Sequence, residues 1–196
     1  MEMAQKLQNH METVGNSVGL NVKVVITDGS QPVGNGIGPT LEAMDILKVL
    51  KNEERAPIDL KERVVLVAGE LLELSGKVAS GAGRQTALQL LESGKAYEKF
   101  LAICKAQGRF TRPVLAPYKT EIRAETSGIL KRIDNRKIAK LAKLSGAPQS
   151  KSAGILLNVH LNDSVEKDQL LYTLYAESQG ELHYALEYKN NHNDII

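Results

Sequence analysis

A chain of 196 residues is long enough for one large domain or two small ones, and long enough to bury a core. Its 42% hydrophobic and 24% charged residues are ordinary for a globular protein, and a net charge of +2 does not indicate a polyanionic partner. No stretch approaches the roughly 20 apolar residues that span a bilayer, and the one cysteine excludes an internal disulfide, so we expect a cytoplasmic protein without membrane contact.

The first 50 residues predict a helix, a strand, a glycine-rich loop and a second helix. Residues 3–14 carry apolar side chains about one helical turn apart, and Gly15 and Gly19 follow them. The β-branched run at 22–26 predicts a buried strand. The loop at 29–38 reads GSQPVGNGIG, and Pro39 then stands where a helix would begin. The apolar stripe expected on that helix consists of Ala43, Ile46, Leu47 and Leu50.

Further helices and then strands are expected along the rest of the chain. Residues 60–74 predict a helix that is apolar over much of its circumference, which is typical of a central core helix. Shorter helices are expected at 84–92 and 96–107, ended by Gly94 and Gly108. Strands are expected at 120–124, 128–133, 154–159, 169–175 and 182–188, and a basic helix at 135–144.

This order of elements predicts an α/β fold followed by an α+β fold. We place the boundary near residue 112, where the character of the chain changes. Residues 1–112 are then mostly helical, and residues 113–196 form a small β-rich α+β domain.

The strand, glycine loop and helix at residues 22–50 are the most informative local feature. Glycines let a backbone approach a phosphate closely, and a helix amino terminus favours anions. However, GNGIGP is not GxGxxG, and GxxxxGK[ST] does not occur in the sequence. A tight structural turn, or a cation site made of backbone carbonyls, is therefore favoured over a dinucleotide site.

Hydrolytic chemistry finds little support in the sequence. His10, His160, His183 and His192 are scattered, and they match no metal-ligand spacing such as HExxH. Ser80 does not lie within GxSxG, the pattern of a nucleophile elbow. We assign no metal-hydrolase site and no nucleophile.

The segment 119–151 is basic, with nine Lys or Arg residues against three Asp or Glu residues. One interpretation is a nucleic-acid surface. The other, which we favour, is a helix whose apolar residues Ile138, Leu141 and Leu144 face the core while its cations are solvated. On that interpretation no nucleic acid binds specifically to Lys131, Arg132, Arg136, Lys137, Lys140 and Lys143.

Residues 24–50, VVITDGSQPVGNGIGPTLEAMDILKVL, resemble the segment ITDGSQPxGxGIGPxLEAxDxLxVL of the pyrimidine nucleoside and AMP phosphorylases. The wording GSQPVGNGIGP is similar to the branch that contains AMP phosphorylase and type 2 thymidine phosphorylase. Residues 122–147 and 161–178 resemble the α+β carboxy-terminal domain of that family. The resemblance implies that residues 1–112 are the carboxy-terminal part of the family's large α/β domain.

The resemblance also implies a reaction. These pentosyltransferases convert a nucleoside or nucleotide and phosphate into a free base and a sugar 1-phosphate, in nucleoside salvage. The family's KxSxGGxGD loop and its SKK segment do not occur in this sequence, and in family members they lie upstream of the ITDGSQP segment. We therefore assign no catalytic, phosphate-binding or base-binding residue. We expect an inactive carboxy-terminal fragment of a homodimeric enzyme that acts on thymidine, another pyrimidine nucleoside or AMP.

A cation is the only cofactor that the resemblance suggests. In some pyrimidine nucleoside phosphorylases a monovalent cation lies beside the phosphate loop. Carried onto this sequence, its ligands are the carbonyls of Val33 and Gly36 and the carboxylate of Asp45. Asp45 is shorter than the usual Glu, and three oxygens hold an alkali ion poorly, so we expect an incomplete site. The alternative is that Asp45 favours the helix start and Gly36 a tight turn.

Two other functions are weighed against the phosphorylase. The first is a non-catalytic module that uses the basic helix or the glycine loop to bind a nucleic acid, a nucleotide or a partner. The second is a biotinyl or lipoyl carrier, which SGIL and LNDSVEKDQLL resemble. Carriers need a modified lysine in a tight hairpin, which the sequence does not contain, so the phosphorylase reading is preferred.

Overall fold

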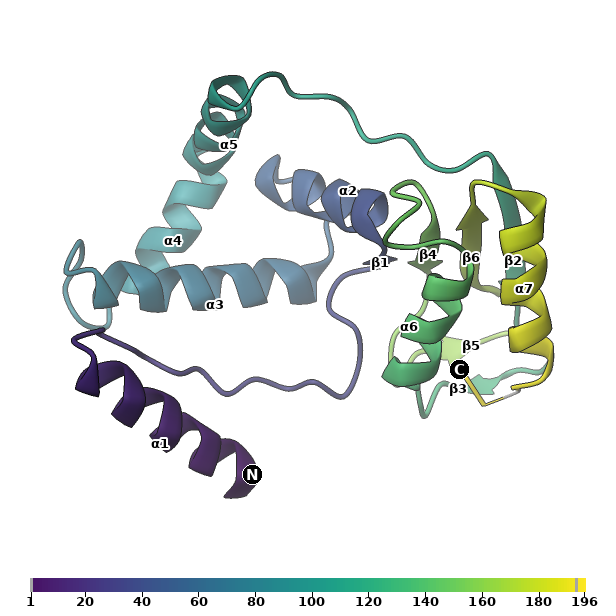
Figure 1. Ribbon diagram of the computed structural model, residues 1–196, viewed down its shortest axis with the longest axis horizontal. Coiled ribbons are helices and arrows are strands. Elements are labelled where there is room, and N and C mark those ends of the chain that lie inside the picture. The colour runs from purple at the N-terminus through teal and green to yellow at the C-terminus, as the bar shows by residue number, and fades with distance from the viewer. Residues whose placement is uncertain (1, 193) are drawn as a thin grey trace.

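The computed structural model describes residues 2–192 and 194–196 (Figure 1). The helices are α1 (Glu2–Ser17), α2 (Pro39–Leu50), α3 (Ile58–Leu74), α4 (Gly83–Glu92), α5 (Lys95–Ala106), α6 (Asn135–Leu144) and α7 (Gln179–Asn190). The strands are β1 (Gly36–Ile37), β2 (Tyr118–Arg123), β3 (Gly128–Ile129), β4 (Gly154–Leu157), β5 (Ser164–Val165) and β6 (Leu170–Ala176). None of the helices formed by these described residues is long and apolar enough to cross a membrane.

The second half of the chain is an antiparallel sheet covered by helices. Four strands follow the order β1-β4-β6-β2, and β3 pairs separately with β5. Helices α6 and α7 pack against each other and against this sheet (Figure 1). This arrangement confirms the expected α+β organisation of the second half.

Strand β1 comes from the first half of the chain but joins this sheet. Gly36 lies opposite Leu156 of β4, and Ile37 lies opposite Ile155. Between α5 and β2 the chain runs as an irregular segment that is largely exposed. The expected boundary near residue 112 falls within that segment and stays a prediction.

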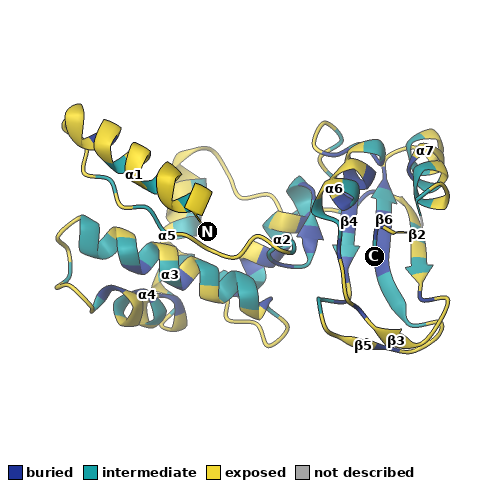
Figure 2. Cartoon of the chain, turned by 90° about the horizontal axis from the view of Figure 1, so that it is seen from below, coloured by how far each residue is buried: buried dark blue, intermediate teal, exposed yellow. Residues whose placement is uncertain are grey.

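Two apolar clusters stabilise the fold. The larger one lies between the sheet and helices α6 and α7, and it includes Ile138, Leu141, Ile155 and Leu174, each almost fully buried. The smaller one joins α2, α3 and α4 through Val49, Val65, Ala87 and Leu91. Burial of such side chains contributes roughly 25 cal/mol per Å² of apolar surface removed from water. The larger cluster is therefore the main core, as Figure 2 shows by its buried strands.

Two expected strands are wrong, and a third is cut short, because β3 covers only Gly128–Ile129 of the expected range 128–133. Residues 22–26 form an irregular segment instead, and Ile26 is 40% exposed. A β-branched run needs a neighbouring strand to pair with, and no described strand pairs with this one. Residues 182–188 belong to helix α7, because Ser178 and Glu181 form a reciprocal capping box that starts a helix there.

Three details of the expected helices also need correction. Helix α1 continues past Gly15 to Ser17, and Gly19 follows with a positive φ of 76°. Helix α3 is not central, since Val67 and Leu71 are exposed. In α2 Leu47 is buried as expected, but Ile46 is exposed, and Leu41 and Val49, which lie outside the expected stripe, are buried. The other expected helices are confirmed to within two residues.

Tyr172 of β6 gives the fold a dependence on alkaline pH. Its side chain is 2% exposed, and burial raises the pKa of Tyr172 above the ordinary value of 10.0. Above about pH 10 the unfolded chain releases this proton and the folded chain keeps it, so the free energy of unfolding falls as pH rises. The loss reaches up to about 1.4 kcal/mol for each pH unit.

We expect Tyr172→Phe to remove this part of the alkaline destabilisation. At neutral pH the same change should alter the free energy of unfolding by less than about 1 kcal/mol, because the hydroxyl makes no hydrogen bond within the described chain. Urea denaturation at neutral pH and above pH 10 measures both quantities. Equal pH slopes for the variant and the parent chain would contradict the assignment.

Candidate functional site

Backbone amides of the glycine loop, residues 29–38, point at two carboxylates. The amide of Gly34 donates to Oδ2 of Asp59 over 2.9 Å. The amides of Asn35 and Gly36 both donate to Oδ2 of Asp45 over 2.7 Å. The two successive amides of Asn35 and Gly36 thus converge on one carboxylate oxygen, a donor arrangement that suits an anion. Here the anions are side chains of the protein itself.

Asp45 is the buried centre of this arrangement. It lies on α2, is 2% exposed, and its second oxygen Oδ1 is 3.0 Å from the ammonium of Lys48 one turn further on. A buried carboxylate is tolerated when donors and an opposite charge offset its desolvation. The two amides and Lys48 supply these, so Asp45 clamps the loop onto the first turns of α2.

Glycine is required where the loop crosses this helix. A Cβ atom on Gly36 would lie 2.4 Å from the carbonyl carbon of Leu41, which leaves no room for a side chain. Gly38 has a φ of 126°, and its amide donates to Oε1 of Glu42 over 3.0 Å. The close approach of loop and helix therefore explains the spacing of the glycines in NGIGP.

The second half of the chain holds the opposite side of the loop through its carbonyls. Nδ2 of Asn135 on α6 donates to the carbonyl of Gly29 over 2.8 Å. The amide of Leu157 on β4 donates to the carbonyl of Asn35 over 2.7 Å. With β1 in the sheet, the loop is fixed from both sides (Figure 1).

The three residues expected to bind a cation lie around one pocket. Val33, Gly36 and Asp45 line a cavity of about 390 Å³ between the loop, α2 and α6. Asp45 already accepts from two amides and Lys48, and a cation would have to displace that ammonium. These contacts favour the structural alternative for Asp45 and Gly36. The cation site stays a prediction.

A family model and several relatives match this chain, the model over its last third and the relatives over nearly all of it. Residues 129–195 match the model of the pyrimidine nucleoside phosphorylase C-terminal domain. A "Putative thymidine phosphorylase" of Legionella pneumophila (strain Paris) is 51% identical over 194 residues. Proteins of the same name from Hahella chejuensis and Parvibaculum lavamentivorans are 48% and 50% identical over 195 residues. The chain belongs to the pyrimidine nucleoside phosphorylase family.

Each alignment covers nearly all of this chain but less than half of the relative. They take in 99% of this chain but 38% of the Legionella protein, and 100% of this chain but 39% of the Hahella and Parvibaculum proteins. The matched stretch includes the glycine loop and its carboxylate clamp. In this member of the phosphorylase family the loop thus joins the helical first half to the C-terminal domain.

Three residues that hold the glycine loop were not identified from the sequence. Lys48 stands three residues after Asp45, and that spacing on a helix is a readable signal for an ion pair. Asp59 lies in the first turn of α3 and Asn135 in the first turn of α6. Their partners are 25 and 106 residues away, so local spacing gave no signal for either contact.

The basic helix α6 lies within the family's C-terminal domain. Ile138 and Leu141 are buried in the main core and Leu144 packs against it, which confirms the expected orientation of the helix. Lys137 forms an ion pair with Asp194, and the ammonium of Lys140 lies 4.9 Å from the ring centre of Tyr188. Two of its cations are therefore engaged within the chain. Whether the others attract a nucleic acid stays a prediction.

Proposed function

We propose that the chain is the carboxy-terminal part of a cytoplasmic pentosyltransferase. The whole enzyme would use phosphate to split thymidine, another pyrimidine nucleoside or AMP into a free base and a sugar 1-phosphate. The observation that carries the proposal is about 50% identity along the whole chain to proteins named "Putative thymidine phosphorylase". The chemistry needs phosphate held at the anomeric carbon and stabilisation of the leaving base. On this proposal the rest of the protein supplies both.

Exposed apolar surface in the first half supports the proposal. Met3 of α1 is 84% exposed, and the other apolar side chains of that face are also exposed, namely Leu7, Met11 and Val14 (Figure 2). The extended segment 22–26 has no described strand beside it. A contiguous apolar surface of this kind marks an interface. In the whole enzyme we expect this apolar surface to pack against the part of the protein that corresponds to the rest of the relatives' length.

The proposal includes the partners expected from the sequence. The whole enzyme takes phosphate and a nucleoside or nucleotide, binds no nucleic acid, and is a homodimer. The carboxylates of the clamp support a structural role for the glycine loop within it, because they occupy the amides that would otherwise be free to bind an anion.

The chain by itself should release no base. The sequence contains neither KxSxGGxGD nor SKK, so the groups that would hold phosphate and base are lacking. We would incubate the chain with phosphate and thymidine, uridine or AMP, and measure free base by chromatography beside a heat-inactivated sample. Base release above that control would show that residues 1–196 contain a complete site.

A further inference from the structure

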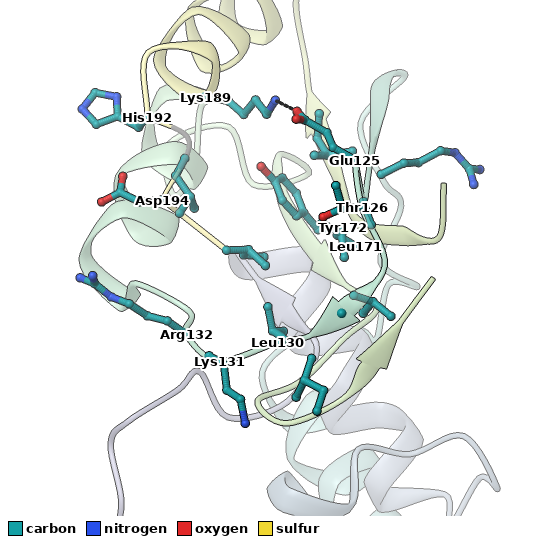
Figure 3. A pocket seen from close by; sticks show the side chains of 18 residues that line it. Glu125, Thr126, Leu130, Lys131, Arg132, Leu171, Tyr172, Lys189, His192 and Asp194 are labelled. Carbon is teal, nitrogen blue, oxygen red and sulfur yellow. Dashed lines mark ion pairs between the residues drawn. The ribbon is translucent and has the colours of Figure 1, made fainter. Parts of the chain in front are cut away.

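A second pocket lies wholly within the C-terminal domain. It has a volume of about 520 Å³ and is bounded by the segment from β2 to β3, by β6, and by His192 and residues 194–196 (Figure 3). This volume falls in the usual range of small-molecule sites. Its apolar lining includes Ile122, Ala124, Leu130, Val165, Leu171 and Ile195. These walls suit the apolar body of a small ligand.

Tyr172 presents a polar group to this pocket. Its side chain is 98% buried, since only 2% is exposed, and Figure 3 shows its hydroxyl directed into the cavity. Burial raises the pKa of Tyr172, so the phenol stays protonated and can donate a hydrogen bond. Within the described chain the hydroxyl has no hydrogen-bond partner. A hydroxyl at the wall of the pocket can donate to a bound acceptor in place of water.

Lys189 supplies a charge at the same pocket. Its side chain is 24% exposed, and its ammonium is 4.0 Å from Oε1 of Glu125, whose own side chain is 89% exposed. An ion pair at this distance with so exposed a partner is weak. Figure 3 places this pair at the end of the pocket toward which the Tyr172 hydroxyl points. An anion that also accepts from Tyr172 would compete well with Glu125.

Lys131 also lines the pocket, but Figure 3 shows it beside Leu130, away from Lys189 and the Tyr172 hydroxyl. Three further charged side chains at the pocket are paired within the chain. Arg132 is 2.7 Å from Asp134, and Arg123 pairs with Glu121. Asp194 pairs with Lys137 of α6. Lys189 and Tyr172 are thus the two donors best placed for a ligand within the cavity.

We propose that this pocket binds a small carboxylate with an apolar ring or branched chain. The carboxylate accepts hydrogen bonds from the hydroxyl of Tyr172 and the ammonium of Lys189. The ligand thereby replaces Glu125 as the ion-pair partner of Lys189. The apolar body packs against Ile122 and Leu171. Charge-assisted hydrogen bonds are stronger than neutral ones, so the carboxylate contributes most of the affinity. The apolar walls limit the size of the ligand.

Benzoate is a suitable probe, because it combines a carboxylate with a ring of the right size. We would titrate it into the ¹⁵N-labelled chain and follow backbone amide shifts. Saturable shifts are expected at Leu130 and Tyr172, with a Kd of about 1 mM or below, which is reasonable for a ligand of this size. Acetate lacks the ring and benzamide lacks the charge, so each should bind at least about tenfold more weakly than benzoate.

Matched variants locate the site. Tyr172→Phe should weaken benzoate binding about fivefold or more, and Lys189→Met about tenfold or more. Tyr184→Phe changes an exposed tyrosine of α7 and Lys143→Met an exposed lysine of α6, so both should leave the Kd unchanged. Equal affinity for benzoate and benzamide, no effect of the two pocket variants, or shifts confined to α1 would each overturn the proposal.

Discussion

Replacing Asp45 with alanine should lower the free energy of unfolding by about 3 kcal/mol. The substitution removes the common acceptor of the Asn35 and Gly36 amides. These two loop amides are then left without a hydrogen-bond partner. It also leaves the ammonium of Lys48 without its carboxylate. Urea denaturation followed by circular dichroism measures the loss.

A matched control separates the clamp from a general effect of charge. Glu54 is exposed beyond the end of α2, so Glu54→Ala should change the free energy of unfolding by no more than about 0.5 kcal/mol. Asp45→Asn keeps the shape of the side chain but loses its charge. Its loss in free energy of unfolding should lie between those of Asp45→Ala and Glu54→Ala. A cost for Asp45→Ala no larger than that for Glu54→Ala would mean that the clamp does not stabilise the loop.

Gly154→Ala should also be severe, because β4 approaches β1 closely at this position. A Cβ atom there would lie 2.1 Å from the carbonyl oxygen of Ile37, and the φ of Gly154 is 143°, which disfavours any side chain. We expect a loss of about 3 kcal/mol from strain and from separation of β1 from β4. Amide exchange at Ile37 should speed up in the same variant.

Gly128→Ala is the matched control for this prediction. Gly128 lies in β3, is exposed, and a Cβ atom on it would meet nothing within 4 Å. Its replacement should change the free energy of unfolding by less than about 1 kcal/mol. Equal effects of the two alanine substitutions would show that the contact between β1 and β4 is not a tight one.

The sequence predicted those elements whose boundaries are set by local chemistry. Helix α2 begins at Pro39, as its proline suggested, and α6 spans the predicted range because Asp134 caps its amino terminus. Helix α7 was mistaken for a strand because large apolar residues occur at every second position, namely Leu182, Tyr184, Leu186 and Tyr188. The capping box at Ser178 decided otherwise, and in the helix Leu182 and Leu186 pack against the main core.

Features that depend on distant partners were beyond the sequence. The run at 22–26 has the composition of a strand, yet composition does not supply the neighbour that a strand requires. The glycine loop was predicted as a loop, and Asp45 was identified, but its role follows from amides ten and nine residues away. The contact of Asn135 with Gly29 and the orientation of Tyr172 into a pocket appear only once the chain is folded.

The most direct test of the account is a chimera with the Legionella pneumophila (strain Paris) relative. The 194-residue stretch of that protein that matches this chain would be replaced by the corresponding residues of this chain. We predict that the folded chimera releases thymine, uracil or adenine from thymidine, uridine or AMP in the presence of phosphate, at a rate within about tenfold of the unmodified relative. A folded chimera that releases no base, beside an active relative, would contradict the proposed function.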